Sequence, residues 1–350
     1  MTVEDTLSNT DATSRLRSLG YDSDLLLQQY YEQGYIILDH ILSTEPDSCL
    51  HLDNLRHCAE LATRLTRDGH WSHRRVVGRA FPPFTKDNLD SWGVQHIMNP
   101  QLDMLAATPL SKTFQHFYGS PILLDIASLL IGADKDQMQM ELFNLLINPS
   151  CHLFALSWHR DDVKPNVSQT EEQSRLETPT YGVQFNTALF DDNCLFVVPG
   201  THRRLRTPLE RTANNTKAPP PTLITETQAS EESQFFAQDG SWQSVDPPNT
   251  FRVKLKAGQT AFYSQRILHR ASYLPSVKRA TLHGCFGDAS EGGKGAAERA
   301  RNVLQHGVEW MRDPQFGKDL PESLKPMWAN LIRMDAAYAN KQLGFSLDND

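Results

Sequence analysis

The segment Leu153-Phe154-Ala155-Leu156-Ser157-Trp158-His159-Arg160-Asp161 joins a short apolar run to a His-x-Asp triplet. The run is one of several short strand-like segments, which are separated by Gly, Pro, Asn and Asp. These segments are 140–147, 153–158, 181–190, 195–198, 251–255, 260–263 and 281–286. Such a series predicts a mostly β core, a sandwich or jelly roll, rather than repeated βαβ units.

Helices are predicted on both sides of this β region. A helical stretch over 25–31 leads to Gly34, which is a plausible stop, and 35–38 reads as a short strand. Apolar residues recur at helical spacing over 47–66 and 109–132. Residues 291–350 return to a helical pattern. We therefore expect a β core with added helices.

The predicted elements divide the chain into three parts. Residues 1–24 form a polar tail, 25–290 form one domain, and 291–350 form a C-terminal helical extension. The domain consists of a helical layer over 25–135 and a jelly-roll core over 136–290. Within the core, the polar stretch 207–250 contains Pro219-Pro220-Pro221 and is expected to be a long loop across the mouth of the sheet.

Composition excludes several classes of protein. The 350 residues include 34 Lys and Arg against 42 Asp and Glu, so the formal charge is 34 − 42 = −8, which disfavours nucleic acid as a partner. No run approaches the ~18 apolar residues of a membrane span. The five cysteines form no Cys-x-x-Cys pair, which argues against a disulfide framework and a structural zinc site. The N-terminus lacks a secretory signal and the C-terminus lacks a peroxisomal address, so we expect a cytoplasmic protein. The sequence carries no signal for an oligomeric state.

Two His-x-Asp triplets occur, His51-Leu52-Asp53 and His159-Arg160-Asp161. With 13 histidines and 42 acidic residues, such triplets are expected by chance, so geometry must separate them. The first triplet lies in a predicted helix, where positions two apart point to different sides. The second follows an extended segment, where positions two apart share a side. Only the second pair can readily chelate one ion.

A third ligand is available in His269, just past the predicted strand 260–263. Two imidazoles and one carboxylate on one side of an octahedral ion leave the other side open, which suits Fe(II) oxygen chemistry. A single histidine is usually structural, but Arg279 and Thr281 strengthen the case. They share a side of another strand, so a guanidinium and a hydroxyl can converge on a carboxylate. Alone, Arg279 would be assigned to a surface salt bridge.

The ordered motifs resemble the phytanoyl-CoA dioxygenase family of Fe(II)/2-oxoglutarate oxygenases. The resemblance rests on His159-Arg160-Asp161, then Asp192-Asn193-Cys194-Leu195-Phe196-Val197-Val198-Pro199-Gly200-Thr201-His202, then His269 and Arg279. The predicted helix followed by a strand over 30–38 also resembles the start of the domain in this family. The resemblance covers about residues 25–290.

The resemblance implies a double-stranded β-helix with the metal at its open end. His159, Asp161 and His269 would hold Fe(2+). Arg279 would bind the distal carboxylate of 2-oxoglutarate with help from Thr281, and Asn186 would contact this cosubstrate.

Three positions depart from the family pattern. Cys194 stands where Gly is usual and Thr201 replaces Ser. Ala271 stands where several relatives have Ser, so one hydrogen bond to the cosubstrate would be missing. Asp161 is retained, whereas related halogenases replace this carboxylate with a small residue. Its presence favours oxygen insertion or hydrogen abstraction over halogenation.

The implied activity is an Fe(II)/2-oxoglutarate-dependent dioxygenase that uses O2 and releases succinate and CO2. It would hydroxylate or desaturate a C–H bond of a small organic substrate, such as a secondary-metabolite intermediate. An acyl-CoA hydroxylase and a non-catalytic ligand-binding member of the fold are alternatives. A Zn(II) or Mn(II) hydrolase or isomerase is a third, although it leaves Arg279 idle.

Other residues have two interpretations each. Arg203, Arg204 and Arg206 could meet an anionic substrate such as an acyl-CoA, but a solvated loop is the better expectation. His283 shares a side of its strand with Arg279 and either lines the pocket or packs in the core. Residues 92–96 either line the substrate site or pack against the helical layer.

Overall fold

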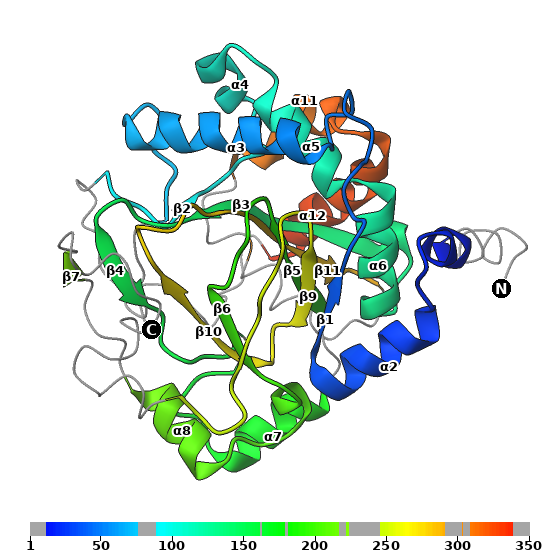
Figure 1. The fold of residues 1–350 in the computed structure, drawn as a ribbon. Helices are drawn as coiled ribbons and strands as arrows, with labels where there is room; N and C mark the ends of the chain where they lie inside the picture. Colours follow the sequence, from blue (N-terminus) through cyan, green and yellow to red (C-terminus); the bar gives the residue numbers. More distant parts are fainter. Residues whose placement is uncertain are drawn as a thin grey trace, which may run out of the picture.

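The computed structural model describes residues 12–75, 89–161, 163–178, 181–216, 222–223, 246–290, 303 and 309–338. Two antiparallel sheets form its centre (Figure 1). The six-stranded sheet has the order β1 (Tyr35–Leu38), β9 (Thr260–Ser264), β5 (Gly182–Ala188), β11 (Ala280–Asp288), β3 (Met138–Ile147) and β2 (Gly93–Val94). The five-stranded sheet has the order β7 (Thr222–Leu223), β4 (His152–Ala155), β10 (Leu268–Tyr273), β6 (Leu195–Val198) and β8 (Phe251–Arg252). The predicted mostly β jelly-roll core with added helices is confirmed.

Helices cover the outer face of the six-stranded sheet. They include α3 (Leu52–Arg67), α4 (Gln101–Ala106), α5 (Leu110–Tyr118), α6 (Pro121–Ile131), α11 (Pro314–Asp319) and α12 (Lys325–Tyr338). In Figure 1, α3 and α5 run across the top of the view and α6 runs down the right, outside the strands. Two further helices, α7 (Gln169–Glu177) and α8 (Pro208–Asn215), lie at the bottom. Helix α2 (Ser23–Gln33) precedes β1, and short 3-10 helices occur at Lys135–Gln137, Thr201–Arg203, Glu309–Arg312 and Glu322–Leu324.

Aromatic side chains join this helical layer to the sheet. The ring of Tyr118 stacks on Phe286 at 4.5 Å, and the ring of Phe117 stacks on Phe143 at 5.8 Å. Phe185 lies 5.5 Å from Phe286, and all these rings belong to one continuous apolar core. Burial of this much aromatic surface stabilises the sheet on its outer side. The alternate residues of the same strands are therefore directed to the space between the sheets.

The inner face of the six-stranded sheet carries polar side chains at its centre. On β11 the inward positions are Thr281, His283 and Cys285, since Leu282 and Phe286 belong to the outer core. The register pairs His283 with Asn186 and Cys285 with Gln184 on β5. A polar row of this kind is unusual inside a core, which makes it a candidate for function.

Several predicted elements are confirmed. The helix predicted over 25–31 lies within α2, and it ends at Gly34, whose φ of 82° suits glycine. The predicted strands 35–38 and 195–198 match β1 and β6. Among the helices in the described ranges, none is both long enough and apolar enough to cross a lipid bilayer.

Other predicted elements were wrong in detail. The helical stretch predicted over 109–132 is present as two helices, because a Gly119-Ser120 pair and Pro121 end α5 and start α6. The helix predicted over 47–66 is α3, which begins at Leu52 rather than at residue 47. The expected loop 207–250 opens with α8, which Thr207 and Glu210 start with a capping box. The rest of that stretch, and much of 291–350, lie largely outside the described residues.

Strand β10 was missed altogether. It carries His269 and Arg270 in a segment with few apolar residues. Arg270 is buried nonetheless, because its guanidinium pairs with Asp246 at 2.8 Å and lies 4.0 Å above the ring of Phe196. These partners are distant in sequence, so strand propensity alone does not predict this element.

Candidate metal centre

The backbone of two adjacent strand segments brings His159 and His269 together. The N–H of His159 donates to the carbonyl of His269 at 2.9 Å, and the reverse bond measures 3.0 Å. Residues that exchange both bonds in an antiparallel ladder carry their side chains on the same face. The imidazole centroids accordingly lie 4.3 Å apart. The missed strand β10 is thus what positions the second histidine.

A backbone carbonyl fixes the orientation of each imidazole. Nδ1 of His159 lies 2.7 Å from the carbonyl oxygen of Ser157, and Nδ1 of His269 lies 2.9 Å from that of Ile267. A carbonyl oxygen can only accept, so each Nδ1 carries the proton and donates it. Each Nε2 is left with a lone pair. This is the tautomer that a metal-binding histidine needs.

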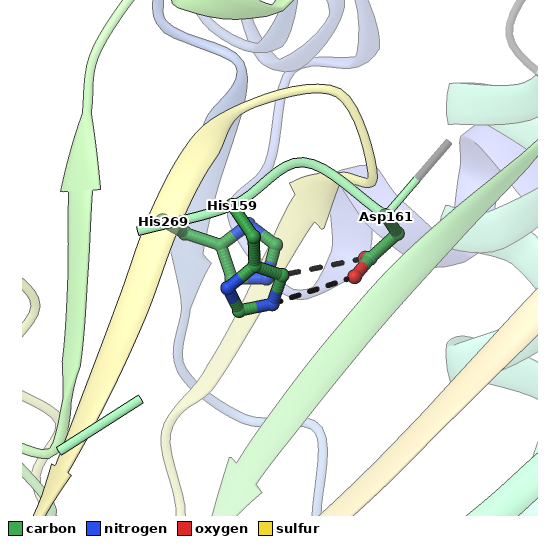
Figure 2. Close-up of side chains that lie close together, drawn as sticks. All are labelled: His159, Asp161 and His269. Atoms are coloured by element: carbon green, nitrogen blue, oxygen red, sulfur yellow. Dashed lines mark ion pairs between the residues drawn. The ribbon is translucent and has the colours of Figure 1, made fainter. Parts of the chain in front are cut away.

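Asp161 completes a three-residue group. Its N–H donates to the carbonyl of Gln265 at 3.0 Å, which holds the backbone beside β10. Its carboxylate oxygens lie 3.6 Å from Nε2 of His159 and 3.9 Å from Nε2 of His269 (Figure 2). All three ligand atoms lie within 4.8 Å of one another, and no other such group occurs among the described residues. The structure thus brings together the three side chains that the sequence analysis expected at a metal site.

This donor set fits a ferrous ion. Two neutral imidazoles and one carboxylate on one side of an ion are typical of open Fe(II) sites. Gln184 on β5 donates from Nε2 to Oδ2 of Asp161, so a second residue orients the carboxylate. Solvent reaches the group, because the side chains of His159 and Asp161 are 25% and 32% exposed.

The electrostatic surroundings lower the pKa of two histidines near this centre, His159 and His283. Burial and the neighbouring His269 lower the pKa of His159 to about 4. Burial, together with the charges of Arg75 and Arg279, lowers the pKa of His283 well below its ordinary value. A neutral imidazole is the form that binds a metal, so no proton has to leave His159 at neutral pH.

Arg279 and Thr281 converge on a carboxylate, and that carboxylate belongs to Asp192. Nε of Arg279 donates to Oδ2 of Asp192 at 2.9 Å and to Oγ1 of Thr281 at 3.2 Å. The Thr281 hydroxyl donates to the same carboxylate oxygen. Within the described part of the chain, Nη1 of Arg279 is buried and has no hydrogen-bond partner. A donor of this guanidinium therefore remains for a further acceptor.

Asn186 lies opposite His283 in the ladder between β5 and β11. Its Oδ1 lies 2.8 Å from Nδ1 of His283 and accepts from the Tyr263 hydroxyl at 3.5 Å. The ring of Tyr263 packs edge-on against His269 at 5.7 Å. His283 therefore belongs to the polar row and has its Nδ1 satisfied by Asn186, and its place in the substrate pocket stays a prediction.

Other candidates from the sequence have structural roles. Nδ1 of His51 accepts from the N–H of Asp53 at 3.4 Å and so caps α3, away from any metal group. Arg206 is buried and pairs with Glu172 at 3.0 Å, while Arg204 pairs with Glu210 at 2.6 Å. The expected solvated loop is thus wrong for Arg206, whose guanidinium is fully covered.

Three residues near the centre were not predicted from the sequence. Gln184 lies two residues before Asn186 on β5, so strand alternation could have placed it on the same face. Asp192 lies in the quoted motif, but nothing in the sequence pairs it with Arg279. Arg75 follows α3 and carries no sequence signal, although its charge acts on Asp161.

Comparison with solved structures gives distant likenesses. AviO1 from Streptomyces viridochromogenes Tue57 is 17% identical with a TM-score of 0.47, over 77% of this chain and 96% of that one. The non-heme alpha ketoglutarate dependent epimerase SnoN from nogalamycin biosynthesis is 16% identical with a TM-score of 0.43, over 77% and 84%. EctD from S. alaskensis, solved with 2-oxoglutarate and 5-hydroxyectoine, is 15% identical with a TM-score of 0.43, over 75% and 74%.

Family comparison is more informative than these single structures. No curated protein sequence matches the chain. The family model described as phytanoyl-CoA dioxygenase (PhyH) matches residues 30–278, a span that contains the whole metal group. The chain therefore belongs to the phytanoyl-CoA dioxygenase family, whose members are Fe(II)/2-oxoglutarate-dependent oxygenases.

Proposed function

We propose that this protein is an Fe(II)/2-oxoglutarate-dependent dioxygenase that hydroxylates or desaturates a C–H bond of a small organic substrate. Succinate and CO2 would be the products of the cosubstrate. One observation carries the proposal. The Nε2 atoms of His159 and His269 and the carboxylate of Asp161 face one another, with both imidazoles held in the metal-binding tautomer.

The three side chains would hold the metal, and the chain would keep them in place. The carbonyls of Ser157 and Ile267 orient the two imidazoles, and Gln184 orients the carboxylate. Fe(II) and 2-oxoglutarate, when bound, supply the oxidising chemistry by which this family activates O2. The protein contributes fixed ligand geometry and a largely buried surrounding that limits water.

Arg279, Thr281 and Asn186 would bind the cosubstrate. The pair with Asp192 holds the Arg279 guanidinium in one position, so its free Nη1 is already oriented for a carboxylate. Thr281 assists by bonding to both members of the pair. Asn186 uses Oδ1 for His283 and Tyr263, which leaves its amide NH2 to donate to a ligand.

The side chains near this centre favour a substrate with an apolar part, such as a secondary-metabolite intermediate. Trp92, Leu146, Leu156 and Tyr273 form a separate buried apolar group, and Tyr273 touches the Arg279 guanidinium. The acyl-CoA alternative needs basic residues for its phosphates. Arg204 and Arg206 are already paired with Glu210 and Glu172, so they do not support it.

A substrate screen tests the proposal. Purified protein with Fe(II), O2 and 2-oxoglutarate would be incubated with fractions of a metabolite extract, and succinate release would be measured. We expect at least one fraction to stimulate release by the wild type and none to stimulate Asp161→Ala. Turnover that needs no 2-oxoglutarate would favour the hydrolase or isomerase alternative. Stimulation by acyl-CoAs alone would overturn the proposed substrate class.

A further inference from the structure

A second guanidinium, that of Arg75, lies near the metal group and has no role in the function proposed above. Its backbone is fixed against β2, because the N–H of Arg75 donates to the carbonyl of Gly93 at 2.8 Å. The carbonyl of Arg75 accepts from the hydroxyl of Ser91 at 3.1 Å. The residue is therefore tied to the edge of the six-stranded sheet.

An aromatic pair supports this guanidinium. The Arg75 guanidinium carbon lies 4.6 Å from the ring centroid of Trp92, and the Trp92 ring packs edge-on against Tyr273 at 5.4 Å. Arg279 lies over the ring of Tyr273 at 5.1 Å. The two guanidinium groups thus lie at the two ends of one aromatic pair. Stacking on an aromatic face leaves the edge N–H groups of a guanidinium available to a ligand.

Glycine at position 93 makes room for this side chain. A Cβ at Gly93 would lie 3.0 Å from Cδ and 3.2 Å from Cγ of Arg75. The same Cβ would lie 3.2 Å from the backbone oxygen of Leu145, so a larger residue would crowd both the arginine and the neighbouring strand. The lack of a side chain at Gly93 therefore leaves the space that the Arg75 side chain occupies.

Within the described ranges, Arg75 differs from the other arginines near the site, which pair with a carboxylate. Arg279 pairs with Asp192, and Arg206 pairs with Glu172. Among the residues that the structure describes, no carboxylate lies within ion-pair distance of the Arg75 guanidinium, which is only half-buried. Burial lowers its pKa, and its charge acts on both Asp161 and His159. A partly desolvated cation without an anion is unfavourable until a ligand supplies one.

We propose that Arg75 is a second carboxylate anchor of this centre, separate from Arg279. The inference rests on the proposed function and refines its ligand class. The carboxylate comes either from the substrate or from the 2-oxo acid end of the cosubstrate. A planar guanidinium that lies over Trp92 can match a carboxylate through two parallel N–H bonds.

Calorimetric titrations of the Fe(II)-loaded protein under anaerobic conditions test this assignment. The probes are 2-oxoglutarate, 2-oxobutyrate, which lacks the distal carboxylate, and benzoate added after saturation with 2-oxoglutarate. The variants are Arg75→Gln, Arg75→Lys and Gly93→Ala, where the last crowds the arginine without removing it. Arg203→Gln is the control, because Arg203 is exposed and only stacks on Tyr31.

We expect Arg75→Gln to weaken the binding of one carboxylate about 10- to 100-fold, the effect of one charged hydrogen-bonded pair. Arg75→Lys should recover part of this affinity, and Gly93→Ala should lose part of it. A loss for both 2-oxo acids assigns Arg75 to the cosubstrate, and a loss for benzoate alone assigns it to the substrate. Unchanged affinity for all three probes overturns the proposal. If the wild-type protein binds no 2-oxoglutarate, the proposed function is contradicted. In that case the titration with benzoate, without 2-oxoglutarate, still tests whether Arg75 binds a carboxylate.

Discussion

The buried pair of Arg279 and Asp192 predicts a large loss of stability in one single variant. The two side chains are 2% and 5% exposed, and Nε lies 2.9 Å from Oδ2. Arg279→Met removes the guanidinium and leaves a buried carboxylate with only the Thr281 hydroxyl and the Cys194 N–H as partners. Breaking such a pair costs about 3–5 kcal/mol. Unfolding entropy of ~2.1 cal/mol/K per residue gives ~0.7 kcal/mol/K for this chain, so Tm should fall by about 4–7 °C.

The double variant Arg279→Met with Asp192→Asn separates stability from cosubstrate binding. It removes both charges, so most of the lost stability should return. The affinity for 2-oxoglutarate should stay low, because the anchoring guanidinium is still absent. The assays are thermal melts by circular dichroism and anaerobic titration with 2-oxoglutarate. The reasoning is refuted if Arg279→Met melts with the wild type, or if the double variant is as unstable as the single one.

The pH dependence of these melts tests whether the Arg279–Asp192 pair stabilises the protein through the ionised form of Asp192. Burial raises the pKa of Asp192, but the charge of Arg279 and the bonds from Thr281 and Cys194 outweigh it, so the pKa lies below its ordinary value. The stabilisation is therefore present above the unfolded carboxyl pKa of ~3.9 and is lost as pH falls through the native value. In Arg279→Met the pKa of Asp192 should instead be raised, so acid relieves the defect. The Tm difference from wild type should shrink between pH 7 and about pH 4.5; a constant difference contradicts this.

Four further variants test the metal centre and the buried ion pairs of Glu172. Asp161→Ala should no longer bind one Fe(II) per chain in a metal analysis, while its circular dichroism spectrum stays that of the wild type. His51→Ala changes only a helix cap and should retain both metal and activity. Equal metal contents in the two variants would contradict the assignment. Gln184→Met should weaken Fe(II) binding about 10- to 100-fold in a competition titration, because the Asp161 carboxylate loses its orienting donor; unchanged affinity would remove Gln184 from the site. Glu172→Gln should lower Tm by about 4–7 °C, because it leaves the buried Arg160 without its carboxylate. A Tm within about 1 °C of the wild-type value, roughly the effect of a surface substitution, would refute this prediction.

The sequence was sufficient for the fold class and for the metal group because both depend on local patterns. Alternating residues put His159 and Asp161 on one side of an extended segment, and the ordered motif supplied His269. What it missed depends on contacts between distant segments. Strand β10 is held by the burial of Arg270 against Asp246, which no local propensity reveals.

The electrostatic partners of the site were equally hidden. The predicted convergence of Arg279 and Thr281 on an anion occurs, but the structure supplies Asp192 as that anion. Arg75 reaches the centre only because α3 and the following segment place it beside Gly93. Such pairings depend on tertiary packing, whereas the residue spacing that identifies metal ligands does not.

The central claim is that three side chains bind one ferrous ion together with 2-oxoglutarate. Anaerobic titration of the apoprotein with Fe(II), followed by 2-oxoglutarate, tests it through visible absorption. We predict one Fe(II) per chain and a broad charge-transfer band that appears only after both components are added, and that is absent from Asp161→Ala. A protein that binds no Fe(II), or that shows the same spectrum with and without 2-oxoglutarate, would contradict the account.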